Sequence, residues 1–234
     1  MRLSILLFDG LTSLDAIGGY EVLSRIPGME VEFVAQRCGV IATDTRRLGL
    51  LAFRDFSEVQ STDILYVPGG PGGRALEHDA AFLDYLRALD RTSTWTVGIC
   101  NGVSLLAAAG LLRGLKATTN WFDQQHITRY GVEFVAERYH REGKYITGAG
   151  VSASIDTALF LTQLLVGDRI AKLIQLGIEY YPAPPFPEKS PAEVPAALQE
   201  VIRRFEADGA DAAQLHLRPP FEGMVQIVSR ASPR

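Results

Sequence analysis

Short apolar runs alternate with longer segments of helical periodicity along most of the chain, and this alternation is the strongest constraint on its fold. Four runs have the length and near-continuous apolar character of buried strands. They are residues 3–8, 31–36, 63–70 and 95–99. Strands of this kind need cover on both faces of their sheet. The pattern therefore predicts an α/β fold with a doubly wound, mostly parallel sheet.

The segments that connect and follow these runs supply the expected helices. Helical spacing occurs in residues 13–26, 79–92, 101–112, 152–166, 168–181 and 195–207. Residues 39–53 predict a small hairpin that turns at Asp44-Thr45, and residues 134–150 predict two further short strands. The Pro-rich stretch 182–195 predicts a loop, and the chain beyond the last helix has weak periodicity and is expected to be irregular.

Charge and composition narrow the classes of function. The 234 residues carry 23 Lys+Arg against 27 Asp+Glu, a formal net charge of −4. Such a mildly acidic chain without a basic run is not expected to bind nucleic acid or an anionic membrane surface. No apolar run reaches the length of a membrane helix, and the N-terminal run is too short for a signal peptide.

The cysteine content indicates the compartment and argues against a metal centre. Two cysteines, Cys38 and Cys100, are too few for a disulfide framework in a chain of this length, so both are expected to be thiols in a reducing cytoplasm. Neither a CxxC nor an HExxH motif occurs. We therefore expect neither a metal nor a cofactor.

The stretch Gly98-Ile99-Cys100-Asn101-Gly102 passes from a predicted strand to a predicted helix within almost no residues. A nucleophile elbow has this arrangement, with small residues two positions before and two after the nucleophile. A thiol at a helix N-terminus lies at the positive end of the helix dipole, which favours the thiolate. The alternative is that Cys100 is a small buried apolar residue, as most free cysteines are.

Two further groups are expected at the same edge of the sheet, because ligands bind at the carboxyl ends of parallel strands. Pro68-Gly69-Gly70 follows the third predicted strand and offers backbone N–H groups without side chains in the way. By itself it could equally be an ordinary turn. Asp15 lies just inside the first predicted helix, where it could simply favour the helix dipole or could share a proton with a substrate or the Cys100 thiol.

Asp15, the Pro-Gly-Gly turn and the Gly98–Gly102 elbow together resemble the ThiJ/PfpI family of the class I glutamine-amidotransferase-like superfamily. The stretches 107–121, 148–160 and 176–186 look most like its isonitrile (isocyanide) hydratase branch. The resemblance implies a flavodoxin-like α/β/α sandwich that spans residues 1–190. Residues 191–234 are then expected to be a C-terminal helix and tail that pack on the same domain.

The resemblance also implies an activity and three catalytic residues. In the hydratase branch, a cysteine attacks the carbon of an isonitrile, and an N-substituted formamide leaves after water has been added. Carried over to this chain, Cys100 is the nucleophile, Asp15 its acidic partner, and Asn101 occupies the position where relatives carry His or Thr. The partner so implied is a small-molecule substrate.

A pocket for the developing negative charge is implied as well. The backbone N–H groups of Gly70 and Asn101 would form it, and Gly69, Asn120 and Trp121 would complete the oxyanion and substrate-binding set. Relatives often carry His where this chain has Asn120. The four histidines, His78, His126, His140 and His216, are expected to be surface or helix residues, with His126 the strongest exception.

Family members are usually dimers, and the apolar segment at residues 179–186 would be an exposed patch unless something covers it, so a homodimer is expected. Two other classes of function remain open at this point. One is a thiol-based stress protein that responds to oxidants or reactive carbonyls without hydratase activity. The other is a ligand-binding module.

Overall fold

The structure, a computed structural model, describes the backbone of residues 1–209 and the side chains of residues 1–204. The chain divides into two compact units, Met1–Tyr180 and Tyr181–Arg234. The irregular stretch expected after the last helix, with His216, lies outside the described residues. No described helix is both long and apolar enough to span a bilayer.

The first unit is built on a seven-stranded sheet. In spatial order its strands are β10 (Tyr139–Glu142), β11 (Tyr145–Gly148), β7 (Trp95–Ile99), β6 (Ile64–Val67), β1 (Arg2–Leu6), β2 (Glu30–Ala35) and β5 (Arg54–Asp55). Every neighbouring pair is parallel except β10 with β11, which is antiparallel. The predicted mostly parallel sheet is confirmed.

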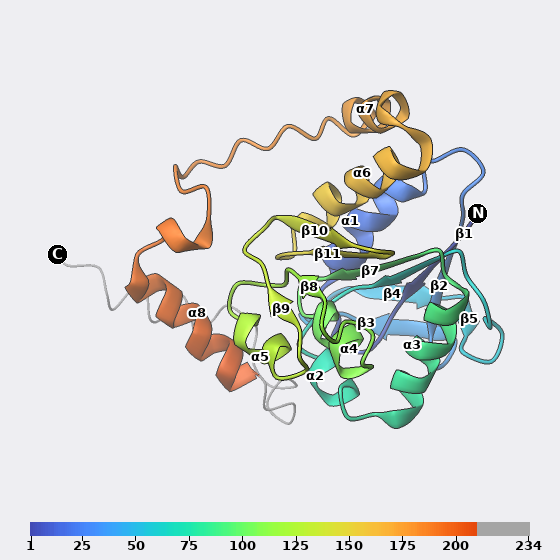
Figure 1. The fold of residues 1–234 in the computed structure, drawn as a ribbon, viewed down its shortest axis with the longest axis horizontal. Coiled ribbons are helices and arrows are strands. Elements are labelled where there is room, and N and C mark those ends of the chain that lie inside the picture. Colours follow the sequence, from blue (N-terminus) through green and yellow to red (C-terminus); the bar gives the residue numbers. More distant parts are fainter. Residues whose placement is uncertain (210–234) are drawn as a thin grey trace. The chain divides into compact units, whose positions relative to one another are not determined.

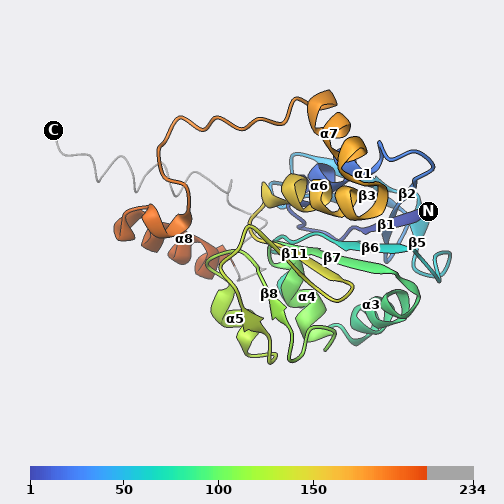
Figure 2. The same ribbon diagram turned by 45° about the horizontal axis from the view of Figure 1, so that its top comes forward.

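Helices cover both faces of this sheet (Figures 1 and 2). One face carries α1 (Ser13–Leu23), α6 (Ala153–Val166) and α7 (Asp168–Gly177), and the other carries α2 (Gly73–Leu76), α3 (Ala80–Thr92), α4 (Gly102–Ala108) and α5 (Gln124–Thr128). The predicted α/β/α sandwich is confirmed. The helix expected over 101–112 is shorter because Gly110, at φ +79°, leaves the helical conformation.

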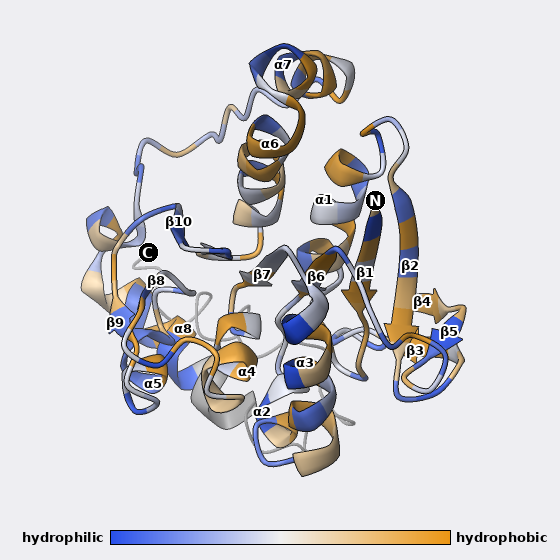
Figure 3. Cartoon of the chain, turned by 45° about the vertical axis from the view of Figure 1, so that its right-hand side comes forward, coloured by the Kyte–Doolittle hydropathy of each residue, from blue (hydrophilic) through white to orange (hydrophobic). Residues whose placement is uncertain are grey.

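Hydropathy follows position in the sheet (Figure 3). The central strands are apolar, and all four residues of β6 are fully buried. The edge strand β10 is mostly hydrophilic in Figure 3, because it consists of Tyr139, His140, Arg141 and Glu142. The strands predicted as continuous apolar runs are thus the ones that lie between two helical layers.

Two small sheets lie outside the main one. The predicted hairpin is β3 (Gly39–Ala42) paired antiparallel with β4 (Gly49–Ala52). The second, β8 (Lys116–Ala117) with β9 (Glu133–Phe134), is parallel and was not predicted, because strands of two residues carry no periodicity. The pair of short strands predicted within residues 134–150 is β10 and β11.

The second unit contains the short 3₁₀-helix η1 (Pro191–Glu193) and α8 (Ala196–Gly209) in its described part. The Pro-rich loop and the final helix therefore occur where the sequence predicts them. The packing of residues 191–234 on the domain 1–190 stays a prediction.

The parallel strands bring three predicted site segments to one edge of the sheet. Asp15 follows β1, the Pro-Gly-Gly turn follows β6, and Cys100 follows β7. The backbones approach so closely that a Cβ on Gly102 would lie 2.5 Å from the Pro68 carbonyl oxygen and would also clash with the carbonyl oxygen of Val67. The elbow thus needs glycine here for its contact with the turn after β6.

Gly102→Ala should therefore lower the free energy of unfolding by about 1–3 kcal/mol, because the obstructing atoms are backbone and cannot rotate away. Gly177→Ala is the matched control, since a Cβ on this helical glycine meets nothing within 4 Å. Urea denaturation of both variants measures the effect. Equal stability of the two variants would contradict the close approach.

Candidate active site

Cys100 is held in a backbone conformation that side chains rarely adopt. Its φ is +56°, in the left-handed region, at the junction between β7 and α4. Such a conformation costs about 1–3 kcal/mol and persists only where surrounding contacts enforce it. The sharp turn that a nucleophile elbow requires is therefore present at the predicted residue.

Two hydrogen bonds to segments outside the elbow hold this strained residue. The Cys100 N–H donates to the Gly148 carbonyl oxygen at the end of β11, at 3.0 Å. The Cys100 carbonyl oxygen accepts from the Thr119 hydroxyl at 2.7 Å. Both backbone groups of the cysteine are therefore satisfied by segments outside the elbow.

The Cys100 thiol is only 5% exposed and lies among polar groups. The Asn120 Nδ2 donates to Sγ at 3.2 Å, and the Asn101 N–H also hydrogen-bonds to the sulfur. Asn120 is 7% exposed, and its Oδ1 has no hydrogen-bond partner among the described residues. The structure thus brings Asn120 and Asn101 to the sulfur.

Asp15 is completely buried on α1. Its Oδ2 accepts a hydrogen bond from the Gly69 N–H at 2.8 Å, whereas Oδ1 has no partner in the described structure. Burial raises the pKa of Asp15 to about 8, the Gly69 hydrogen bond opposes that rise, and the charge of Asp44 adds to it. The carboxyl therefore carries a proton at neutral pH.

Ionisation of Asp15 affects the Cys100 thiol electrostatically, without a direct hydrogen bond between the two among the described contacts. Burial raises the pKa of the Cys100 thiol well above its usual range, and a charge on Asp15 raises it further. The hydrogen bonds from Asn120 and Asn101 lower the pKa but do not outweigh these causes. The expectation of a low thiol pKa was wrong, because a helix terminus cannot offset complete burial.

Asn101 joins the elbow to the turn after β6 through a pair of side-chain hydrogen bonds. Its Oδ1 accepts from the Gly70 N–H at 2.6 Å, and its Nδ2 donates to the Gly70 carbonyl oxygen at 3.2 Å. The amide side chain of Asn101 thus bonds to both the N–H and the carbonyl oxygen of Gly70. As a result, the N–H groups of Gly69 and Gly70 are both engaged, by Asp15 and Asn101 respectively.

An ionic cluster contacts the segment of Asn120 and connects α2, α4 and α5. Arg74 forms ion pairs with Glu77 and Asp123, and Asp123 also accepts from the Ser104 hydroxyl at 2.7 Å. The Asp123 N–H donates to the Asn120 carbonyl oxygen at 2.8 Å. The cluster therefore fixes the segment that carries Asn120. Trp121, in the same segment, is half-buried and packs edge-on against Phe122.

His126 belongs to this cluster and not to the elbow. Its Nε2 lies 2.6 Å from the Glu77 Oε2, which also accepts from the Tyr130 hydroxyl at 2.7 Å. Burial would raise the pKa of Glu77, but the bonds from His126 and Tyr130 hold it below its usual range. His140 pairs with Glu137 at 2.8 Å, and His78 is exposed. No described histidine contacts the Cys100 thiol.

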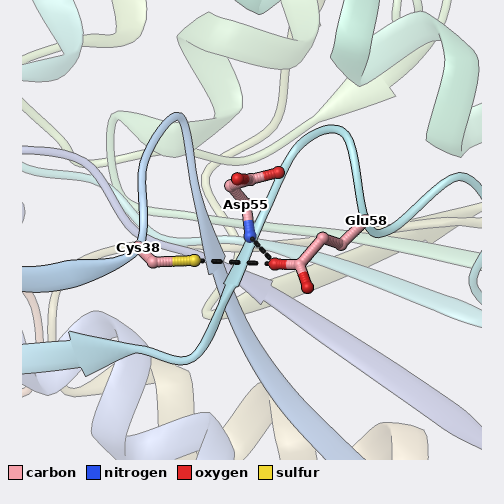
Figure 4. A group of neighbouring side chains, drawn as sticks. All are labelled: Cys38, Asp55 and Glu58. Carbon is pink, nitrogen blue, oxygen red and sulfur yellow. Dashed lines mark hydrogen bonds between the residues drawn. The ribbon is translucent and has the colours of Figure 1, made fainter.

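The other cysteine, Cys38, lies in an exposed group with Asp55 and Glu58 (Figure 4). Its thiol lies 3.5 Å from the Glu58 Oε2, which also accepts from the Asp55 N–H at 3.0 Å. The Glu58 Oε1 pairs with Arg54 at 3.0 Å. Glu58 thus links Cys38 to both residues of β5, and these local contacts explain why the three side chains lie together. The pKa of Cys38 is raised by partial desolvation and by Glu58.

Sequence reasoning missed several residues around the site. Thr119 was not singled out, although its hydroxyl donates a hydrogen bond to the Cys100 carbonyl oxygen. The Arg74–Asp123 ion pair joins residues far apart in the sequence, and nothing in their spacing indicates it. Asp44 was expected only as a hairpin turn residue, yet its charge acts on Asp15.

Comparison with known proteins assigns the family. The sequence profile of the DJ-1/PfpI family matches residues 1–164. The chain belongs to the DJ-1/PfpI family, as its motifs predict. It is 36% identical over 227 residues to the isonitrile hydratase of Pseudomonas putida, an alignment that covers 93% of this chain and 99% of that protein.

Solved structures agree with this assignment. A THiJ/PfpI family protein from Pseudomonas syringae superposes with a TM-score of 0.85 at 29% identity, over 90% of this chain and 89% of that one. Drosophila melanogaster DJ-1beta superposes with a TM-score of 0.70 at 20% identity, over 77% and 98% of the two chains. The flavodoxin-like fold implied by the motifs is confirmed.

The buried Asp15 carboxyl predicts a specific pH dependence of stability. Its pKa is 3.8 when unperturbed and about 8 in the folded chain, so between these values the folded state keeps a proton that the unfolded state has lost. Its contribution to stability is therefore lost as the pH rises through this window, by at most about 1.4 kcal/mol per pH unit.

Asp15→Asn should remove this component, so the variant should gain stability relative to the native chain from pH 5 to pH 8. Urea denaturation at several pH values measures the difference. Asp9→Asn, at a half-exposed carboxylate on the neighbouring loop, is the control. Parallel stability curves for the native chain and Asp15→Asn would show that Asp15 does not hold a proton.

Proposed function

We propose that this chain is a cysteine-dependent hydratase that adds water to an isonitrile and releases an N-substituted formamide. The observation that carries the proposal is a buried thiol on an elbow, close to a carboxyl that keeps its proton at neutral pH. The similarity to the Pseudomonas putida isonitrile hydratase, which extends over nearly the whole of both chains, supports the same substrate class.

The first step joins the sulfur to the substrate. The Cys100 Sγ bonds to the isonitrile carbon, and the same carbon takes a proton from the Asp15 carboxyl, while the thiol proton replaces the one that Asp15 has given up. The product is a neutral thioimidate, Cys–S–CH=N–R. An acid that is still protonated at neutral pH suits this step, because an isonitrile carbon must gain a proton as well as a nucleophile.

The second step uses water. Its oxygen bonds to the thioimidate carbon, and one of its protons passes to the nitrogen. The carbon–sulfur bond then breaks, the remaining hydroxyl proton returns to the Cys100 sulfur, and R–NH–CHO leaves. The unpartnered oxygens Asp15 Oδ1 and Asn120 Oδ1 are suited to bind that water, because buried polar atoms near the thiol otherwise lack hydrogen bonds.

Asn101 takes a positioning role in this proposal. Its side chain holds the turn after β6 through Gly70, while its backbone N–H contacts the sulfur. That N–H is a donor for the negative charge that develops in the second step. The N–H groups of Gly69 and Gly70 join it only if substrate displaces their present acceptors, Asp15 and Asn101. Trp121 would contact the substituent of the substrate.

The activity is tested by incubating the purified full-length protein with cyclohexyl isonitrile and following the formamide proton by NMR. Cys100→Ser should reduce turnover by at least about 100-fold, and Asp15→Asn by about 10²–10⁴-fold, the usual range for a lost acid–base group. Cys38→Ser is the matched control and should keep full activity. If no formamide appears while peroxide oxidises Cys100 selectively, the chain is a redox-responsive thiol protein instead.

Substitution of Asn101 separates its side chain from its backbone. Asn101→Ala removes both hydrogen bonds to Gly70 and should lower kcat by about tenfold with a smaller change in KM, because the turn beside the sulfur loosens. Asn101→Thr supplies one hydroxyl and should recover part of that loss. Steady-state kinetics of the three proteins on one isonitrile give the comparison. Equal kcat values would show that only the backbone N–H at this position matters.

The proposal also includes the oligomeric state and the cellular compartment of the protein. We infer that it works as a homodimer in the cytoplasm, on the basis of its family and of its two unpaired cysteines. Light scattering at micromolar concentration should give twice the mass of 25.6 kDa. A mass of one chain would contradict the dimer.

A further inference from the structure

The β3–β4 hairpin is joined by backbone hydrogen bonds to the loop that leads into α1. The Gly10 N–H donates to the Ala42 carbonyl oxygen, and the Asp44 N–H donates to the Leu11 carbonyl oxygen, both at 2.9 Å. Leu11 also forms an isolated parallel bridge with Thr43. The tip of a hairpin outside the main sheet is thereby fixed next to the start of the helix that carries Asp15.

Thr12 connects this hairpin tip to the site. Its hydroxyl donates to the Asp44 Oδ2 at 2.8 Å instead of capping α1. Its N–H donates to the Gly69 carbonyl oxygen at 2.9 Å, and its carbonyl oxygen accepts from the Asp15 N–H at 3.1 Å. Gly69 in turn donates to the Asp15 carboxyl group. Thr12 therefore touches Asp44 on one side and the Asp15–Gly69 pair on the other.

Asp44 is a carboxylate without a counter-ion among the described side chains. Its oxygens accept from the Thr12 hydroxyl and from the Thr45 N–H, at 2.8 and 2.7 Å. The nearby cations Arg37 and Arg46 approach Asp9 instead, at 3.5 and 3.9 Å. The negative charge at the hairpin tip is thus not neutralised by an ion pair.

The other elements around Asp15 supply no opposite charge. From β6, the Tyr66 hydroxyl donates to the Asp15 backbone carbonyl oxygen at 2.8 Å. From the elbow comes Cys100. From α6, the neutral Ser154 hydroxyl binds the Leu14 carbonyl oxygen, and the nearest acid of that helix, Asp156, pairs with Arg138. Asp44 is therefore the group whose fixed charge can act on the Asp15 carboxyl.

We propose that Asp44 is a positioning residue of the site: its negative charge, held in place by Thr12, favours the proton-bearing state of Asp15. A like charge disfavours ionisation of a buried carboxyl, and burial limits the screening of that charge by salt. The proposal rests on the Asp15–Cys100 pair and does not require that an isonitrile is the substrate. A purely structural Asp44 would fix the hairpin turn and have no effect on titration.

Asp44→Asn separates the two roles, because the amide oxygen can still accept from Thr12 while the charge is removed. The measurement is the rate of Cys100 alkylation by iodoacetamide, resolved by mass spectrometry, on the full chain between pH 5 and pH 10. Loss of the Asp44 charge makes Asp15 easier to ionise, and an ionised Asp15 disfavours the Cys100 thiolate. Alkylation of Asp44→Asn should therefore be slower than that of the native chain, by up to about threefold, at pH values around and above the Asp15 pKa of about 8, so that the profile lies at higher pH by roughly half a unit.

Asp9→Asn is the matched control: it removes a nearby carboxylate that has arginine partners, and it should leave the profile in place. In an Asp15→Asn background, Asp44→Asn should shift the profile much less than in the native chain. An unchanged profile for Asp44→Asn, an equal shift for Asp9→Asn, or a full shift without Asp15 would each overturn the proposal.

Thr12→Val keeps the test decisive if Asp44→Asn does not fold. It leaves the charge on Asp44 but removes the hydroxyl that holds the carboxylate against the start of α1. The profile should move in the same direction by a smaller amount, and a shift to lower pH would contradict the proposal. Because alkylation uses no isonitrile, failure of the hydratase assay and failure of this test are separate results.

Discussion

The left-handed backbone of Cys100 is the constraint on which the site depends. This conformation is held by a hydrogen bond from the Cys100 N–H to the Gly148 carbonyl oxygen at the end of β11, and by one from the Thr119 hydroxyl to the Cys100 carbonyl oxygen. Gly102 allows α4 to start against the carbonyl groups of the neighbouring turn. The side chain of Asn101 then fastens that turn to the elbow. Each contact would be misplaced if Cys100 relaxed to an ordinary conformation.

Burial decides the chemistry of the two acids at this elbow. A helix terminus and two N–H donors favour an ionised sulfur, but complete burial disfavours every charge more strongly. The proton therefore stays on Asp15 at neutral pH, and the neighbouring carboxylate of Asp44 acts in the same direction. In the proposed mechanism, the acid that delivers a proton to the isonitrile carbon is thus present before the substrate binds.

The parts of this arrangement that follow from local sequence could be predicted, and the parts that depend on distant contacts could not. The apolar runs of β1, β6 and β7 specify a covered parallel sheet, and the glycines around Cys100 specify an elbow. The pairing of Asn101 with Gly70 joins two loops that are 31 positions apart, so no local pattern indicates it. The direction of the thiol pKa was mispredicted because burial is not visible in a five-residue motif.

The complete burial of Asp15 and its retained proton also bear on which molecules can enter. At neutral pH the thiol of Cys100 and the carboxyl of Asp15 are both uncharged. A charged ligand that gives up its hydration would therefore find no opposite charge on these two groups. Transfer of an ammonium or carboxylate group from water into such a site would cost free energy, because its hydration is not replaced. Transfer of a compact neutral molecule would cost little. The uncharged state of Cys100 and Asp15 thus favours the binding of neutral ligands over charged ones.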